Sequence, residues 1–180
     1  MAQIDRFANL LWEEAKRFLE KGRECSGSLA ETANLHAALM LSFCALEAHV
    51  NAISEEFAGR PTLSAHERGL LLEREVRLEE GEFHLQSGLK VARLEDRIEF
   101  LHARFSGKAI DRSVAWWGRL TAAVNLRNQL THAKNVPAIT ETAVRSAMEA
   151  ILDALDALYR AIYKRKFPPA NRGLQSRLSF

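Results

Sequence analysis

The sequence predicts an all-α protein, an antiparallel helical bundle of about five or six helices with a small insert that has the pattern of a β-hairpin. Two long segments carry apolar residues at alternating steps of four and three, which is typical of helices that pack against other helices. Gly and Pro residues separate the helical segments. Of the 180 residues, 47% are hydrophobic and 27% charged, as in a globular domain with one core.

The first two helices are expected at residues 4–21 and 29–57. Gly22 and the small polar residues after it end the first helix, and Gly59 with Pro61 ends the second. The apolar stripe of the second helix predicts that it packs against other helices. This stripe consists of Leu39, Phe43, Leu46, Val50, Ile53 and Phe57.

The pattern changes after the second helix. Thr62 can cap a shorter helix that runs to about Arg74. Beyond it, apolar and polar residues alternate on both sides of Glu80-Gly81, which favours a β-hairpin. Residues 75–90 are therefore expected to form a surface insert, rich in Glu and Arg, within a bundle domain of residues 1–166.

Helical spacing returns at residues 91–106, and again in a helix that starts at Asp111 or Ser113 and is limited by Pro137. The final helix starts near Thr140, and Pro168-Pro169 ends it. Its apolar stripe consists of Val144, Met148, Ile151, Leu155, Leu158 and Ile162.

The net charge of +2 is too small for a protein whose whole surface binds nucleic acid, but the charge is unevenly distributed. Five basic residues and no acidic one follow from Lys164 onward. Lys164, Arg165 and Lys166 are either a solvated helix end, followed by a flexible basic tail at 167–180, or part of an arm that attracts RNA phosphates.

Patterns for metal, cofactor or membrane binding do not occur in the sequence. The His and Cys residues lack the spacing of a zinc site, and no Gly-rich phosphate-binding loop is present. No uninterrupted apolar run approaches the roughly 20 residues of a membrane helix, and the N-terminal segment is not signal-like. We therefore expect a cytoplasmic protein that uses no metal, no cofactor and no membrane.

Polar residues interrupt the apolar stripe of the helix before Pro137. Trp117, Leu120 and Val124 are spaced for a core-facing stripe, and Asn128 and Thr131 continue the same line. Arg127 and His132 flank that line at about −80° and +60°. An unpaired polar group in a core costs on the order of 1–3 kcal/mol, so this cluster should face a cleft, a partner or its own members.

The remaining faces of this helix also carry apolar residues, among them Ala123, Leu126 and Leu130. A helix that is apolar on nearly every face is buried on nearly every face, which predicts a position between the bundle and a second copy of the chain. Within one ideal helix Arg127 and His132 lie about 140° apart. The two side chains can then cooperate only across a homodimer or after unwinding of the last turn.

The segment from Arg127 to His132 resembles the signature of the HEPN superfamily (higher eukaryotes and prokaryotes nucleotide-binding), an Arg followed after four to six residues by a His. It shares the polar residue straight after the Arg, here Asn128. The helix that contains residues 45–51 is similar to the long helix that packs beside the motif helix in that superfamily. The resemblance covers most of residues 4–166, and its specific part is six residues long.

This resemblance implies a metal-independent endoribonuclease of the toxin or phage-defence type, with a composite active site at a homodimer interface. Arg127 would bind the scissile phosphate, His132 would transfer protons, and Asn128 would position the phosphate or the His. RNA and a second copy are the implied partners, with an antitoxin or defence-system protein as a further candidate. Some members carry a Tyr two positions after the His, where this chain has Lys134, so control through a modified Tyr is not implied here.

Glu47, Asn51 and Thr131 are candidates for supporting roles, and Lys134 for a contact with RNA. Glu47 lies at the edge of the apolar stripe of the second helix and is either a boundary residue or the partner of Arg127 or His132. Two other functions remain open. The chain could be a non-catalytic HEPN-like helical module that binds nucleotide, RNA or a partner protein, or a structural bundle whose motif match is accidental.

Overall fold

The computed structural model describes residues 2–134, 136 and 138–180. Over these residues the chain is mostly helical with one small antiparallel sheet, as the sequence predicts. The elements are α1 (Ala2–Glu24), α2 (Leu29–Ala58), α3 (Ala65–Leu72), β1 (Arg74–Glu79), β2 (Glu82–Leu89), α4 (Leu94–Ser106), α5 (Ala115–Thr131), α6 (Glu141–Tyr163) and the 3₁₀ helix η1 (Pro168–Arg172).

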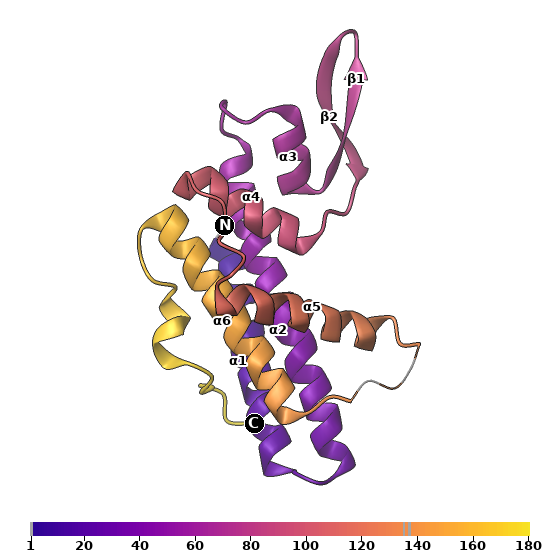
Figure 1. Cartoon of the computed structure of the whole chain (residues 1–180), viewed down its shortest axis with the longest axis vertical. Coiled ribbons are helices and arrows are strands. Elements are labelled where there is room, and N and C mark those ends of the chain that lie inside the picture. The colour runs from indigo at the N-terminus through magenta and orange to yellow at the C-terminus, as the bar shows by residue number, and fades with distance from the viewer. Residues whose placement is uncertain (1, 135, 137) are drawn as a thin grey trace.

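Three long helices, α1, α2 and α6, lie side by side and enclose most of the core (Figure 1). An ion pair of 2.6 Å joins Arg23 near the end of α1 to Glu141 at the start of α6. At the other end of α6, the Tyr163 hydroxyl donates to Glu56 near the end of α2, at 2.6 Å. Helix α6 is therefore antiparallel to α1 and parallel to α2. The buried stripe residues are Leu39, Phe43, Leu46, Val50, Ile53 and Phe57 of α2 and Val144, Met148, Ile151, Leu155 and Leu158 of α6.

Helix α2 is long and apolar enough, by length and composition, to cross a membrane. In this fold, however, 61% of its most apolar 18-residue window is buried inside the protein. Packing against α1 and α6 therefore accounts for its composition.

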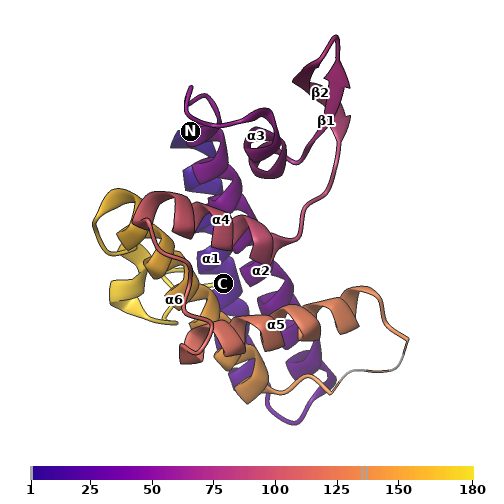
Figure 2. The ribbon, with the colours of Figure 1, turned by 45° about the horizontal axis from the view of Figure 1, so that its top comes forward.

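Helices α4 and α5 run across the three long helices instead of along them (Figures 1 and 2). The antiparallel packing that the sequence predicts for the whole bundle thus describes α1 against α2 and α6, and not α4 or α5. The buried side chains of α5, Trp117, Leu120 and Val124, face the core, where α5 packs on α2 and α6. This crossing brings the last turns of α5 over the middle of α2.

Three helices begin later than their sequence suggests, among them α4, which starts at Leu94 and not near Val91. Helix α3 is capped by Ser64, which forms a capping box with Glu67, and not by Thr62. Asp111 does not start α5, because its carboxylate accepts from the backbone N–H of Ser113 at 2.9 Å and holds a turn there. Helix α5 starts only at Ala115.

The predicted hairpin is confirmed, and it projects from the helical body beyond α3 (Figure 1). Glu80 and Gly81 both have positive φ, of 51° and 88°, as a two-residue turn of type I′ requires. The hairpin approaches α3 closely at Gly69, where an added Cβ would lie 2.6 Å from Cγ2 of Val76. A larger residue at position 69 would push the hairpin away from the body.

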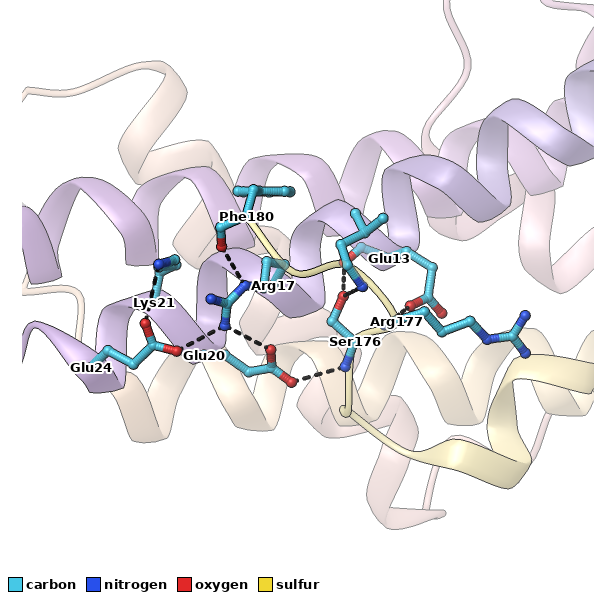
Figure 3. A network of polar contacts seen from close by, with 9 residues as sticks. Glu13, Arg17, Glu20, Lys21, Glu24, Ser176, Arg177 and Phe180 are labelled. Carbon is cyan, nitrogen blue, oxygen red and sulfur yellow. Dashed lines mark hydrogen bonds and ion pairs between the residues drawn. The ribbon is translucent and has the colours of Figure 1, made fainter.

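The C-terminal segment, expected to be a flexible tail at 167–180, instead lies along α1 (Figure 3). Phe167 is buried, and its ring packs edge-on against His49. Farther along, the backbone N–H of Ser176 donates to Glu20 at 2.9 Å, and the hydroxyl of Ser176 donates to the backbone carbonyl of Glu13 at 2.8 Å. The segment carries no periodic apolar pattern, so the sequence did not reveal that one aromatic anchor and the polar groups of α1 suffice to hold it.

Burial of His49 makes the stability of the fold depend on pH. Desolvation lowers the pKa of this imidazole from 6.5 to about 4. Above pH 6.5 the ring is neutral in both the folded and the unfolded chain. Between pH 6.5 and about 4 the unfolded chain binds a proton at His49, whereas the folded chain does not. Stability is therefore lost as the pH falls through this window. Compared with His49→Leu, the wild type should lose about 3 kcal/mol more between pH 7 and pH 4 in urea unfolding; parallel pH profiles would contradict this.

Candidate active site

Arg127 lies half-buried between α5 and α2, with 22% of its side chain exposed. Its Nη2 atom is 3.5 Å from Oε1 of Glu47, and its guanidinium carbon is 5.2 Å from the centroid of the Phe43 ring. The Nε atom is buried and has no hydrogen-bond partner among the described residues. The Glu47 carboxylate thus forms an ion pair with Arg127, which is one of the interpretations that the sequence left open.

His132 ends α5 as its C-terminal capping residue. Its backbone N–H donates to the carbonyl of Asn128 at 2.9 Å, and its imidazole is exposed. The ring lines a cavity of about 770 Å³ on the outer side of α5, which we call the His132 cavity. Lys134 lines the same cavity, so it is the one predicted RNA-contacting cation that lies beside the motif. The cavity is formed by Asn125, Asn128, Gln129, His132, Lys134, Val136 and Ala138.

Arg127 lines a different cavity of about 450 Å³, which lies between α2, α4, α5 and the base of the hairpin. We call it the hairpin-side cavity. Asn125 and Asn128 line both cavities and form the ridge between them. Within one chain, therefore, Arg127 and His132 face different spaces, as the helical angle predicts.

The last turn of α5 is not unwound. The helix continues to Thr131, whose hydroxyl donates to the backbone carbonyl of Arg127 at 2.8 Å. Thr131 thus closes the helix end, and its oxygen also lies 4.0 Å from the sulfur of Met40 on α2. Of the two routes by which Arg127 and His132 could meet, unwinding is absent from this described segment, and a second copy of the chain remains.

Arg97 is a prominent polar residue of this region that the sequence interpretation missed. Its side chain is 4% exposed and forms an ion pair of 3.2 Å with Glu73. Its Nη2 donates to Asn51 at 2.7 Å and to the carbonyl of Leu71 at 2.9 Å. Asn51 is therefore engaged by Arg97, and not by Arg127 as its supporting role would suggest. A signal existed, because position 97 falls within the apolar stripe of Leu94, Ile98 and Leu101.

Burial affects the pKa of the Arg97 guanidinium. Desolvation lowers the pKa of its guanidinium, and the nearby carboxylates of Glu73 and Glu47 act in the opposite direction. The guanidinium links α4 to α2 through Asn51 and to the end of α3 through the carbonyl of Leu71. It therefore holds the base of the hairpin against the body of the protein.

The other predicted cations lie elsewhere. Lys164, Arg165 and Lys166 follow the end of α6, on the opposite side of the molecule from the last turn of α5 (Figures 1 and 2). Lys164 donates to the carbonyl of Ala161 and so caps its own helix. Within the described residues, no group of three or more His, Cys, Asp or Glu side chains is arranged to hold a metal ion.

Removing the guanidinium of Arg97 should destabilise the fold. Arg97→Met leaves Glu73, Asn51 and a backbone carbonyl without their donor, at a cost of about 3–5 kcal/mol in the free energy of unfolding. Arg93→Met is the matched control, because that side chain is 75% exposed. Urea unfolding measures the difference, and hydrogen exchange should show faster exchange in the hairpin. Equal stabilities of the two variants would show that Arg97 does not fasten this region.

Comparison of the chain with protein-family models, curated proteins and solved structures gives no match. The arrangement of Arg127, Asn128 and His132 at the end of α5 is therefore the feature that bears on function.

Proposed function

We propose that the protein is a metal-independent endoribonuclease of the HEPN type whose active site is completed by a second copy of the chain. The observation that carries the proposal is the incomplete use of the two motif side chains. Arg127 is 22% exposed and contacts the Glu47 carboxylate only at 3.5 Å, and His132 presents an exposed imidazole at a helix end. A fixed forked cation and an imidazole are the groups that cleavage of a phosphodiester needs.

The chemistry is transfer of the phosphoryl group to the neighbouring ribose hydroxyl. His132 accepts the proton of the 2′-hydroxyl while O2′ forms a bond to phosphorus, and the bond from phosphorus to O5′ breaks. O5′ takes up a proton and leaves as a 5′-hydroxyl, and the other product carries a 2′,3′-cyclic phosphate. Arg127 stabilises the charge that develops on the phosphorus oxygens, and Asn128, on the ridge between the cavities, can orient either group.

A dimer through the outer face of α5 would bring the two kinds of side chain together. The exposed residues of this face are small or uncharged, which allows two helices to approach without burying an unpaired charge. A twofold axis close to the ridge of Asn125 and Asn128, which borders both cavities, would place His132 of one copy near Arg127 of the other. Beside this ridge, the residues of the outer face are Gly118, Thr121, Ala122 and Gln129.

The proposed chemistry implies two further partners, a restraining protein and RNA. An RNase in the cytoplasm needs restraint, so an antitoxin or another defence-system protein is the kind of partner that we propose. Lys134 is the cation best placed to contact RNA beside His132. The basic residues at the end of α6 are too far around the molecule to share that role.

A second function is supported by the ion pair between Arg127 and Glu47. If that pair persists, the chain is a non-catalytic HEPN-like module that binds nucleotide, RNA or a partner protein without turnover. Binding of RNA without any cleavage would favour this function.

The first test is cleavage in EDTA. The pure protein should cleave single-stranded or structured RNA in EDTA and leave 2′,3′-cyclic phosphate ends, detected on denaturing gels and by mass spectrometry. His132→Ala should lower the rate by about 100-fold or more, because an acid or base of this kind contributes roughly 10²–10⁴-fold. The matched control is His84→Ala, an exposed His on the hairpin. Equal cleavage by wild type and His132→Ala, or none by either on any RNA, would count against the enzyme.

The second test asks whether the site is shared between two chains. Arg127→Ala and His132→Ala should each be inactive alone, but a refolded mixture should regain up to about a quarter of the wild-type activity, since half of the dimers carry one complete site of two. Activity after mixing, with sedimentation to verify the dimer, measures this. A mixture as inactive as its components would place both residues in a site formed by one chain.

A further inference from the structure

One side of the hairpin-side cavity has no role in the cleavage chemistry proposed above. Its inner side is formed by α2 and α5, but its outer side comes from the segment between β2 and α4. The volume of about 450 Å³ lies within the range of about 300–1,000 Å³ that is typical of small-molecule sites. Arg127 lies at the inner side, so a phosphate bound there would have its neighbouring nucleoside at this cavity.

The charges of the cavity balance one another. Three Arg–Glu pairs line it, with N–O distances of 3.5, 3.2 and 3.9 Å. A cavity with balanced charge does not attract a chain of phosphates, and it suits a neutral polar group beside a single phosphate. The pairs, in the order of these distances, are Arg127–Glu47, Arg97–Glu73 and Arg93–Glu95.

The remaining lining combines an apolar rim with carboxamides. Leu89 and Val91 are 73% and 77% exposed and present apolar surface at the edge of the cavity. The carboxamides of Asn125 and Asn128 project from α5 on the other side. An apolar surface for a ring face, with carboxamides for a ring edge, is the combination that recognises an unstacked nucleobase.

We propose that the hairpin-side cavity binds one unstacked adenine or cytosine base through its N6 or N4 amino group, and that Asn125 and Glu95 are its specificity-determining residues. The inference builds on the proposed function, because the phosphate beside that base is the one at Arg127. The base lies between the rim of Leu89 and Val91 and the carboxamide of Asn125. Its amino group donates to the Asn125 carbonyl oxygen and to a carboxylate of the cavity.

Discrimination follows from the direction of these hydrogen bonds. A carboxylate only accepts, so Glu95 favours adenine and cytosine, whose amino groups are N6 and N4, over guanine and uracil, which present a carbonyl oxygen at the corresponding position. Glu47 adds to this effect once a phosphate has displaced it from Arg127. Asn125 and Glu95 thus supply base preference to a site whose Arg127 and His132 contact only phosphate and ribose.

Nucleoside 5′-monophosphates test the proposal without any need for cleavage. AMP and CMP should each bind about tenfold more tightly than GMP and UMP, the size of one specific hydrogen-bonded base contact, in titrations followed by NMR. Asn125→Ala and Glu95→Gln should remove most of this preference while binding of inorganic phosphate stays unchanged. Asn9→Ala, the same change at an exposed position of α1, should leave it intact.

Equal affinity for all four nucleotides, or a preference that survives in both variants, would overturn the proposal. The cleavage assay separates this failure from failure of the proposed function. RNA cleavage with no base preference would leave the enzyme and remove the base pocket. Base-selective binding that depends on Asn125, with no cleavage of any RNA, would keep the pocket and remove the enzyme.

Discussion

A regular α-helix through Thr131 is the constraint on which the candidate site depends. Because each residue advances the helix by about 100°, side chains five positions apart cannot face the same space. Hydrogen bonds at both Thr131 and His132 keep the final turn closed, and burial of Trp117, Leu120 and Val124 fixes which side of α5 faces the body. The orientation of Arg127 toward α2 and of His132 toward the outside is therefore a property of the core packing.

Burial distinguishes the two arginines of the hairpin-side cavity. Arg97 has 4% of its side chain exposed, and its two terminal nitrogens are held by a carboxylate, a carboxamide and a backbone carbonyl, so a ligand would have to displace these buried bonds. Arg127 is 22% exposed and Glu47 is 45% exposed, at a distance of 3.5 Å. An ion pair of this kind contributes about 0–1 kcal/mol, and a phosphate with two parallel hydrogen bonds can displace it. One arginine is thus structural, and the other is available.

The sequence predicted the parts of the fold that local pattern determines. The stripes of α2 and α6 and the Glu80-Gly81 turn each specify an element through its own residues, and these predictions are confirmed. The crossing of α4 and α5 depends on how side chains of different helices fit together, and no periodicity within one helix encodes that. The path of the C-terminal segment depends on Phe167 and on polar groups of α1 more than a hundred residues away. At the site, helix angles placed Glu47 at the edge of the apolar stripe of α2 but left its partner open, and the structure pairs it with Arg127. Arg97 was missed because it lies within the otherwise apolar stripe of α4.

The separation of the two cavities by α5 has a kinetic consequence for the proposed enzyme. A site that needs two chains exists only in the dimer, so at low concentration its activity rises with the square of the amount of protein. Dilution alone then lowers the activity by dissociating the dimer, and a small rise in synthesis of the protein raises the activity more than in proportion. A restraining protein would not need to enter either cavity, because covering the outer face of α5 would keep each chain apart from its partner.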